Sequence, residues 1–179
     1  WLDLSGDGQW YHQEAIIQLA AGWNPWHALP DLPVSASARP WIVSYPRAIW
    51  ITAASLYQLT GHIEYGKALH WILFTAAALW TARALAALGI PRFSAFGGGL
   101  LLALNTTVLI QMPGFYLDGD LYCLLLLYLA ASLVWLRDRD PLAALTCGSS
   151  AILLCGAKFL GPFYAGIGLV TMLAAELLR

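Results

Sequence analysis

The stretch LYCLLLLYLAASLVWL, residues 121–136, carries no charged side chain and is almost entirely apolar. Such a run indicates a helix that crosses a lipid bilayer. Its borders are polar, with Asp118 and Asp120 on one side and the charged loop of residues 137–141 on the other. This stretch therefore predicts one spanning helix with a polar loop at each end.

The composition of the whole chain extends this interpretation. Of its 179 residues, 60% are hydrophobic and 11% are charged, whereas a soluble domain carries about 25% charged residues. A chain so poor in charge cannot cover a soluble surface, so we expect an integral membrane protein. The formal net charge of −1 argues against a nucleic-acid partner, which would require clustered Lys and Arg.

Further apolar runs, separated by Pro or Gly residues, are long enough to be spanning helices. They cover residues 66–88, 93–112, 142–160 and 163–178. With residues 121–136 they predict an all-α fold, a polytopic transmembrane helical bundle with about five spans over residues 66–179. The glycines at 97–99 lie in one of these runs and predict close helix packing there.

Residues 1–65 are expected to form the first outer loop, with interfacial or re-entrant helices. Residues 10–21 and residues 47–59 are each expected to form a helix that is too short to cross a bilayer. Tryptophan is enriched where a bilayer meets water. The first helix is surrounded by Trp10, Trp23 and Trp26. We therefore expect this region to lie on the membrane surface.

Arginines set the expected orientation. If residues 66–88 are the first span, the arginines near helix ends share one side of the membrane, which should be the cytoplasmic side. These arginines are Arg83, Arg92, Arg137, Arg139 and Arg179. Residues 1–65, 111–120 and 161–162 would then lie on the outer side. Because the chain starts at Trp1 and stops in an apolar run, we expect it to be truncated at both ends.

The polar loop DLSGDGQWYH, residues 3–12, holds the first candidate site residues. Asp7 is the candidate catalytic residue, because a carboxylate can accept a proton from an attacking hydroxyl group or bind a divalent cation. The alternative is that Asp7 caps the helix that follows. Asp3 is expected to be solvated. His12 either contacts substrate or lies on the surface in water.

Asp118 and Asp120, on either side of Gly119, are the second candidates. In an extended stretch alternate residues face the same way, so both carboxylates could bind one metal ion together with Asp7. Hard oxygen ligands suit magnesium or manganese. The alternative is that Asp120 is the N-cap of the following helix, where its charge suits the helix dipole.

Basic residues on the same side are candidates for binding a phosphate. Lys158 lies inside an apolar run, and a charge at membrane depth favours a functional role. Arg39 and Arg47 flank the segment between Pro40 and Pro46 and could bind the same group. The alternatives are that Lys158 extends to the interface and that the arginines are ordinary interfacial anchors.

The order of these motifs resembles one family. The motifs are residues 7–12, residues 19–25, Ser44-Tyr45-Pro46-Arg47, residues 61–67, Asp118-Gly119-Asp120 and Lys158-Phe159-Leu160-Gly161. In this order they resemble polytopic membrane glycosyltransferases of the GT-C superfamily. The similar branch includes bacterial mannosyl- and arabinosyltransferases that use polyprenyl-phosphate-linked sugar donors.

The resemblance implies transfer of a sugar from a polyprenyl-phosphate-linked donor to a lipid, glycan or protein acceptor. The site would lie at the outer face of the bacterial cytoplasmic membrane, in a multi-pass protein. Asp7 would be the catalytic base or its metal-binding equivalent, and Asp118 and Asp120 would assist, through magnesium or manganese in some branches. Lys158, with Arg39 or Arg47, would bind the donor phosphate.

Two other functions remain open. A transporter or channel segment would carry ionisable residues near the bilayer midplane in several helices, whereas the acidic residues here cluster at helix ends. A non-catalytic assembly subunit would leave Asp7 and Asp118 far apart in space. The separation of these two carboxylates therefore discriminates between the functions.

Overall fold

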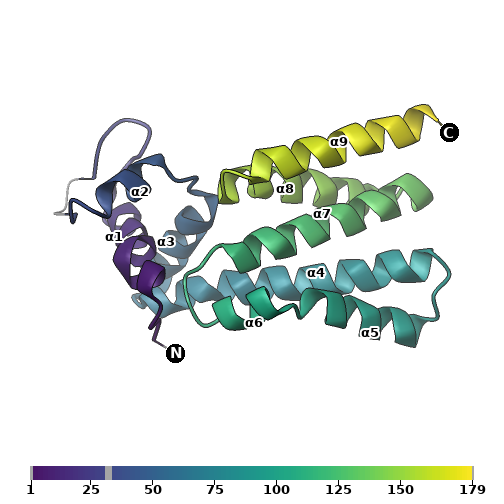
Figure 1. The fold of residues 1–179 in the computed structure, drawn as a ribbon, viewed down its shortest axis with the longest axis horizontal. Helices are drawn as coiled ribbons and strands as arrows, with labels where there is room; N and C mark the ends of the chain where they lie inside the picture. The colour runs from purple at the N-terminus through teal and green to yellow at the C-terminus, as the bar shows by residue number, and fades with distance from the viewer. Residues whose placement is uncertain (1, 31–33, 179) are drawn as a thin grey trace.

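The computed structural model describes residues 2–30 and 34–178. Over that part the chain is all-helical, with 76% of its residues in helices and no strand. The expected all-α fold is confirmed. The molecule has two parts, a bundle of long helices and a group of short helices across one end of it (Figure 1).

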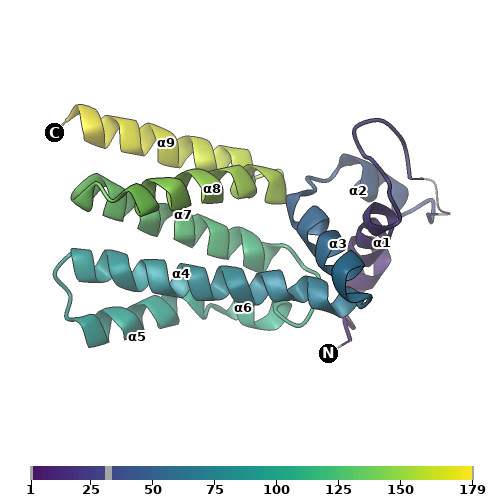
Figure 2. The ribbon, with the colours of Figure 1, turned by 180° about the vertical axis from the view of Figure 1, so that it is seen from behind.

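The bundle contains five long helices. They are α4 (Ala68–Ala87), α5 (Arg92–Ala103), α7 (Asp118–Asp138), α8 (Pro141–Ala157) and α9 (Gly161–Leu177). α7 packs between α4 and α8, while α5 packs on α4 and α9 packs on α8. Figures 1 and 2 show these helices side by side from opposite directions.

The short helices of residues 8–67 form what we call the N-terminal cap. They are η1 (Gly8–His12), α1 (Gln13–Ala20), α2 (Arg39–Ser44), α3 (Ala48–Thr60) and η2 (Ile63–Lys67). The cap covers the end of the bundle where α4, α7 and α9 begin and α8 ends (Figure 1). We call this the capped end. The turns before α5 and α8, and the end of α9, lie at the opposite end.

Small residues set the spacing between α4 and α5. A Cβ atom added at Gly99 would lie 2.4 Å from the Ala78 carbonyl oxygen and 2.7 Å from the Ala82 backbone nitrogen. Only glycine therefore fits at this contact, and the expected close packing is confirmed at Gly99. Gly97, in contrast, faces no atom within 4 Å.

One expected helix is wrong. Residues 93–112 do not form a single span, because α5 ends at Ala103 and a separate helix α6 (Thr106–Gln111) begins after Asn105. The Asn105 side chain accepts a hydrogen bond from the Val108 backbone N–H at 2.9 Å. Asparagine is a favoured N-cap residue, so Asn105 starts a new helix inside an apolar run.

Two helices in the described part of the chain are long and apolar enough to cross a membrane. They are Ile63–Ala87, with a mean hydropathy of 1.2, and Asp118–Asp138, with a mean hydropathy of 1.8. The apolar helices Pro141–Ala157 and Gly161–Leu177 are shorter. Of the expected spans, two therefore meet the criterion of length and composition.

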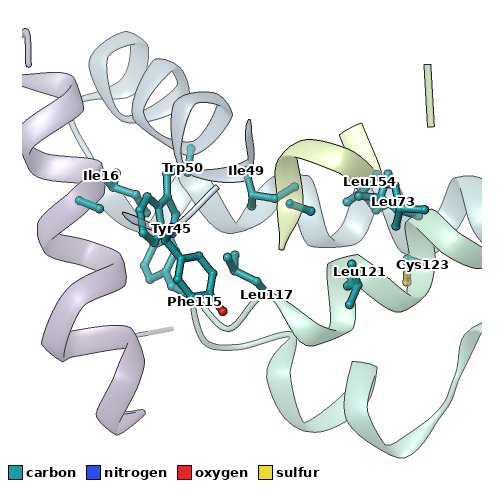
Figure 3. Close-up of a cluster of buried hydrophobic side chains, with 14 of the residues drawn as sticks. Ile16, Tyr45, Ile49, Trp50, Leu73, Phe115, Leu117, Leu121, Cys123 and Leu154 are labelled. Atoms are coloured by element: carbon teal, nitrogen blue, oxygen red, sulfur yellow. The ribbon is translucent and has the colours of Figure 1, made fainter. Parts of the chain in front are cut away.

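A buried aromatic cluster joins the cap to the bundle (Figure 3). Trp50 of α3 is 1% exposed, and Tyr45 and Phe115 are also buried. Tyr45 stacks on Trp50 with ring centroids 5.5 Å apart. Large aromatic side chains dominate the free energy of such contacts, so this cluster fixes the cap against the bundle.

Candidate functional site

The central contact of the capped end is an ion pair between Asp118 and Lys158. Asp118 begins α7, and Lys158 follows directly after the last residue of α8. The Gln111 amide supports this arrangement, since its Nε2 donates to Asp118 Oδ2 at 3.3 Å and its Oε1 accepts from the Gly119 N–H at 2.7 Å. Both charged side chains remain partly exposed.

The expected extended geometry of residues 118–120 is wrong. These residues form the first turn of α7, where the N-cap position belongs to Leu117 and not to Asp120. Helical residues two positions apart do not face the same way. Asp118 therefore pairs with Lys158, while Asp120 is buried and lies 2.6 Å from His70 Nδ1 through its Oδ1.

The donor set does not fit a metal ion shared by these carboxylates. Asp118 is bound by Lys158 and Gln111, and Asp120 by His70. Within the described residues, no group of three or more His, Cys, Asp or Glu side chains is arranged to hold a metal ion. A magnesium or manganese ion at Asp7 stays a prediction.

Asp7 occupies the N-cap position of η1, but its side chain makes no capping hydrogen bond. The Ser5 hydroxyl instead accepts from the Gly8 N–H at 3.2 Å. The charges of Asp7 and Asp118 both act on the Tyr11 phenol. Asp7 precedes η1 of the N-terminal cap and Asp118 begins α7, so both belong to the capped end (Figure 1).

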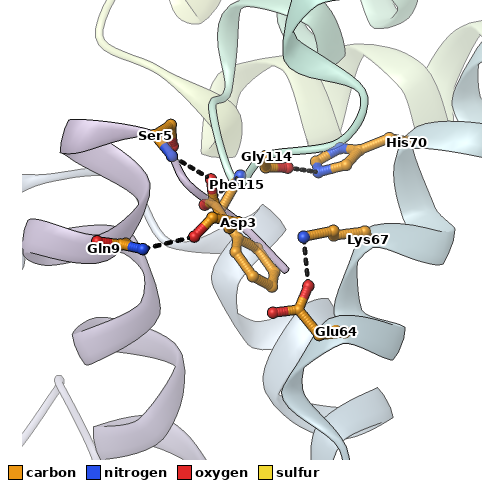
Figure 4. A network of polar contacts seen from close by, with 8 residues as sticks. All are labelled: Asp3, Ser5, Gln9, Glu64, Lys67, His70, Gly114 and Phe115. Carbon is orange, nitrogen blue, oxygen red and sulfur yellow. Dashed lines mark hydrogen bonds and ion pairs between the residues drawn. The ribbon is translucent and has the colours of Figure 1, made fainter. Parts of the chain in front are cut away.

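Asp3 is not solvated, contrary to expectation. It is 3% exposed, and its carboxylate accepts from the Ser5 N–H at 2.8 Å and from the Phe115 N–H at 2.9 Å (Figure 4). A Cβ atom at Gly8 would lie 1.9 Å from Asp3 Oδ2, so glycine is required there. Asp3 therefore joins the N-terminal segment to the loop before α7.

His12 is not a surface histidine, because it is 2% exposed. The Trp50 indole Nε1 donates to His12 Nδ1 at 2.9 Å. Burial, together with the Lys158 charge, lowers the pKa of His12 to about 3. The ring is therefore neutral near pH 7. Because an indole can only donate, Nδ1 is the acceptor and Nε2 carries the proton.

Aromatic rings pack around Tyr45, whose side chain is a hydrogen-bond partner of Lys158. Tyr45 contacts the edge of Phe159, with ring centroids 5.2 Å apart, and lies 6.0 Å from Tyr11 and from His12. Burial, and then the charges of Tyr45, Asp7 and Asp118, raise the pKa of the Tyr11 phenol. We use the name capped-end cluster for Asp7, Tyr11, His12, Tyr45, Asp118 and Lys158.

The two arginines expected to bind phosphate are arranged differently. Arg47 donates to the Val43 carbonyl and lies over the Trp23 ring at 5.4 Å. Arg39 is exposed at the start of α2. In the described part of the chain, no hydrogen bond or ion pair joins either arginine to Asp118 or Lys158. Lys158 is therefore the cation of the cluster.

The sequence analysis did not name Tyr11, Tyr45, Trp50, Gln111 or His70 as site residues. His70 could have been found, because an ionisable residue inside an apolar run suggests a specific role. The others could not be separated from ordinary interfacial or core residues. Their positions depend on the packing of α3 and α6 against α7.

Comparisons with known proteins do not identify the chain. Searches of protein-family models, curated proteins and solved structures found no significant match. The resemblance to GT-C glycosyltransferases therefore remains a proposal.

Proposed function

We propose that the chain is a multi-pass membrane glycosyltransferase of GT-C type. Its site is the capped-end cluster, and its donor is a polyprenyl-phosphate-linked sugar. The observation that carries the proposal is the Asp118–Lys158 ion pair at the capped end. The two helices long enough to span a bilayer begin at this end, which also holds Asp7. A lysine at a helix end near the interface is suited to bind a lipid phosphate.

The exposed apolar side chains of the bundle support membrane embedding. Large hydrophobic side chains lie uncovered along the outer helices, where a soluble monomer would rarely expose so many. They include Phe93, Leu101, Ile152, Phe163 and Val170, which are between 62% and 91% exposed. Contact with lipid tails accounts for these surfaces. α8 and α9, with 17 residues each, would be short spans.

Lys158 binds the donor phosphate in this proposal. Its ammonium group is already paired with Asp118 and is partly exposed. A phosphate that approached the pair would compete with the Asp118 carboxylate for the same cation. The ion pair thus holds Lys158 at the capped end, where a donor phosphate can replace the Asp118 carboxylate as its partner.

Asp7 supplies the base. An acceptor hydroxyl attacks the anomeric carbon, the bond from that carbon to the phosphate oxygen breaks, and the phosphate leaves with the electron pair. The proton of the hydroxyl passes to Asp7. Asp7 suits this role because no hydrogen bond or ion pair occupies its carboxylate in the described part of the chain. His12 does not suit it, because Nδ1 is occupied by Trp50 and Nε2 already carries a proton.

The test is donor turnover by the purified protein in lipid nanodiscs. Polyprenyl-phosphate-linked hexoses and pentoses are supplied in turn, and release of polyprenyl phosphate is measured with and without glycan acceptors. We expect turnover of at least one donor and a loss of about 100-fold or more in Asp7→Asn. Arg92→Gln, at the opposite end of the bundle, is the matched control and should retain turnover.

Failure has two distinct forms. If donors bind but Asp7→Asn turns over as fast as the unaltered protein, Asp7 is not the base. If no polyprenyl phosphate binds at all, the transferase proposal fails. A transporter segment or a non-catalytic assembly subunit then becomes the better account.

A further inference from the structure

A second polar contact, separate from the capped-end cluster, lies beneath the loop before α7. His70 of α4 and Asp120 of α7 are 7% and 2% exposed. His70 Nδ1 lies 2.6 Å from Asp120 Oδ1, and His70 Nε2 lies 3.0 Å from the Gly114 carbonyl oxygen. The His70 ring of α4 therefore contacts α7 and the loop before it. We call this loop the link (residues 112–117).

The partners of the ring determine where its protons lie. A backbone carbonyl accepts but cannot donate, so Nε2 carries a proton and donates it to Gly114. A separation of 2.6 Å between Nδ1 and a carboxylate oxygen requires a second proton between the two atoms. Both ring nitrogens are therefore occupied by hydrogen bonds, and His70 has no free nitrogen for a ligand.

The link is held from its other side by Asp3. The Gly114 carbonyl accepts from His70, and the next backbone group, the Phe115 N–H, donates to Asp3 Oδ2 at 2.9 Å. Figure 4 shows His70 and Asp3 on the two sides of this peptide group. Two side chains from distant parts of the sequence thus fix one short segment.

The segment fixed in this way leads directly to Asp118. The link ends at Leu117, and α7 begins at Asp118, whose first turn also contains Asp120. His70 therefore contacts the Gly114 carbonyl, four positions before Asp118, and the Asp120 carboxylate, two positions after it. A shift of the link would move the Asp118 carboxylate relative to Lys158.

The environment of Asp120 explains why His70 is needed there. Asp120 Oδ2 is buried without a hydrogen-bond partner in the described residues, and Asp120 lines a cavity of about 10 Å³ together with Gln111, Tyr116 and Cys123. Without His70, both carboxylate oxygens would be buried without a protein partner, which is strongly unfavourable. His70 is therefore the side chain that makes the burial of the Asp120 carboxylate possible.

We propose that His70 is a positioning residue. Paired with Asp120, it fastens the link to the bundle and so sets the position of Asp118 opposite Lys158. This role does not depend on the transferase proposal, because it concerns the geometry of the link and not the chemistry at Asp7. It predicts that removing His70 loosens the link while the remote helices remain intact.

The test is hydrogen–deuterium exchange of the whole protein in nanodiscs, resolved by segment. In His70→Phe, which fills the same volume without hydrogen bonds, we expect exchange in residues 113–117 to rise about tenfold or more. Exchange in α8 and α9 should be unchanged. In Asp120→Asn, the amide can donate to Nδ1 of a neutral His70, while His70 Nε2 still donates to Gly114. This variant should retain most of the protection of residues 113–117 from exchange. His62→Phe, at an exposed histidine outside the pair, is the matched control.

The other outcomes overturn the proposal. If His70→Phe leaves exchange in the link unchanged, the link is held by other contacts. If exchange rises equally in all helices, His70 contributes to general stability and does not position the link. If His70→Phe does not fold, His70→Leu, which also lacks hydrogen-bonding groups, replaces it with the same expected and contradicting results.

Discussion

The carboxylate of Asp3 accepts a hydrogen bond from the backbone N–H of Phe115, 112 positions along the chain, at 2.9 Å. This contact joins the segment that precedes the N-terminal cap to the loop that precedes α7. Its other oxygen accepts from the Ser5 N–H. Asp3 therefore fixes the N-terminal segment to the loop that leads to Asp118.

Asp3→Ala should destabilise the fold by about 1–3 kcal/mol, because it leaves the buried Phe115 N–H without an acceptor. Unfolding by denaturant in detergent micelles measures this change. Asp7→Ala, four positions along, is the control and should change the free energy of unfolding by about 0.5 kcal/mol or less, since Asp7 makes no capping bond. Equal losses in both variants would contradict the role of Asp3.

Acid should weaken the fold through His12. The pKa of the folded His12 is lowered to about 3 by burial, from an ordinary value near 6.5. Between these values the unfolded chain binds a proton that the folded chain does not, so stability falls as the pH decreases from about 6.5 towards 3. Above pH 7, His12 should not contribute to the pH dependence of the free energy of unfolding.

Melting temperatures of the protein between pH 7.5 and 4 measure this dependence. His12→Asn keeps an acceptor for the Trp50 indole but cannot take up a proton in this range. We expect its melting temperature to fall less steeply with decreasing pH. Parallel curves for the two proteins would show that His12 does not titrate as the geometry requires.

The glycine triplet of α5 offers a matched pair of substitutions. Gly99→Ala should cost about 1–3 kcal/mol, because its Cβ would lie 2.4 Å from the Ala78 carbonyl oxygen. Gly97→Ala meets no atom within 4 Å, and alanine favours a helix over glycine by about 1 kcal/mol. Opposite shifts in melting temperature are therefore expected. A stabilising Gly99→Ala would contradict the close approach of α4 and α5.

Asp118→Asn should strengthen the binding of polyprenyl phosphate, because the Asp118 carboxylate competes with the phosphate for Lys158. We expect an increase in affinity of about two- to fivefold, since a partly exposed ion pair contributes at most about 1 kcal/mol. Native mass spectrometry or a fluorescent-lipid competition assay measures the dissociation constant. Lys158→Gln should weaken the same binding. Weaker binding in both variants would show that Asp118 does not compete with the ligand.

Much of the helical pattern follows from local sequence. The short helices near residues 10–21 and 47–59, and the starts of α8 and α9, agree with the expected breaks at Pro, Gly and charged residues. α7 begins three residues before the expected run, and α8 ends three residues before the end of its expected run. The placement of Asp7, Asp118 and Lys158 at one end also follows from the order of apolar runs and polar loops. These features depend on residues close together in the chain.

The remainder depends on partners distant in sequence. Asp3 and His12 looked solvated because nothing nearby in the sequence buries them; Phe115 and Trp50 do so only after folding. Asp120 looked like a cap because its partner, His70, lies on another helix. Asn105 is a local indication of the break before α6, but the apolar residues on both sides of it favour one continuous helix.

Photo-crosslinking with a polyprenyl phosphate that carries a photoreactive group beside its phosphate tests the central claim most directly. The protein is labelled in nanodiscs, and the modified peptides are identified by mass spectrometry. We expect adducts in residues 115–118 and 157–160 at the capped end, and their loss in Lys158→Gln. Adducts confined to residues 88–92 and 137–141 at the opposite end would contradict the account.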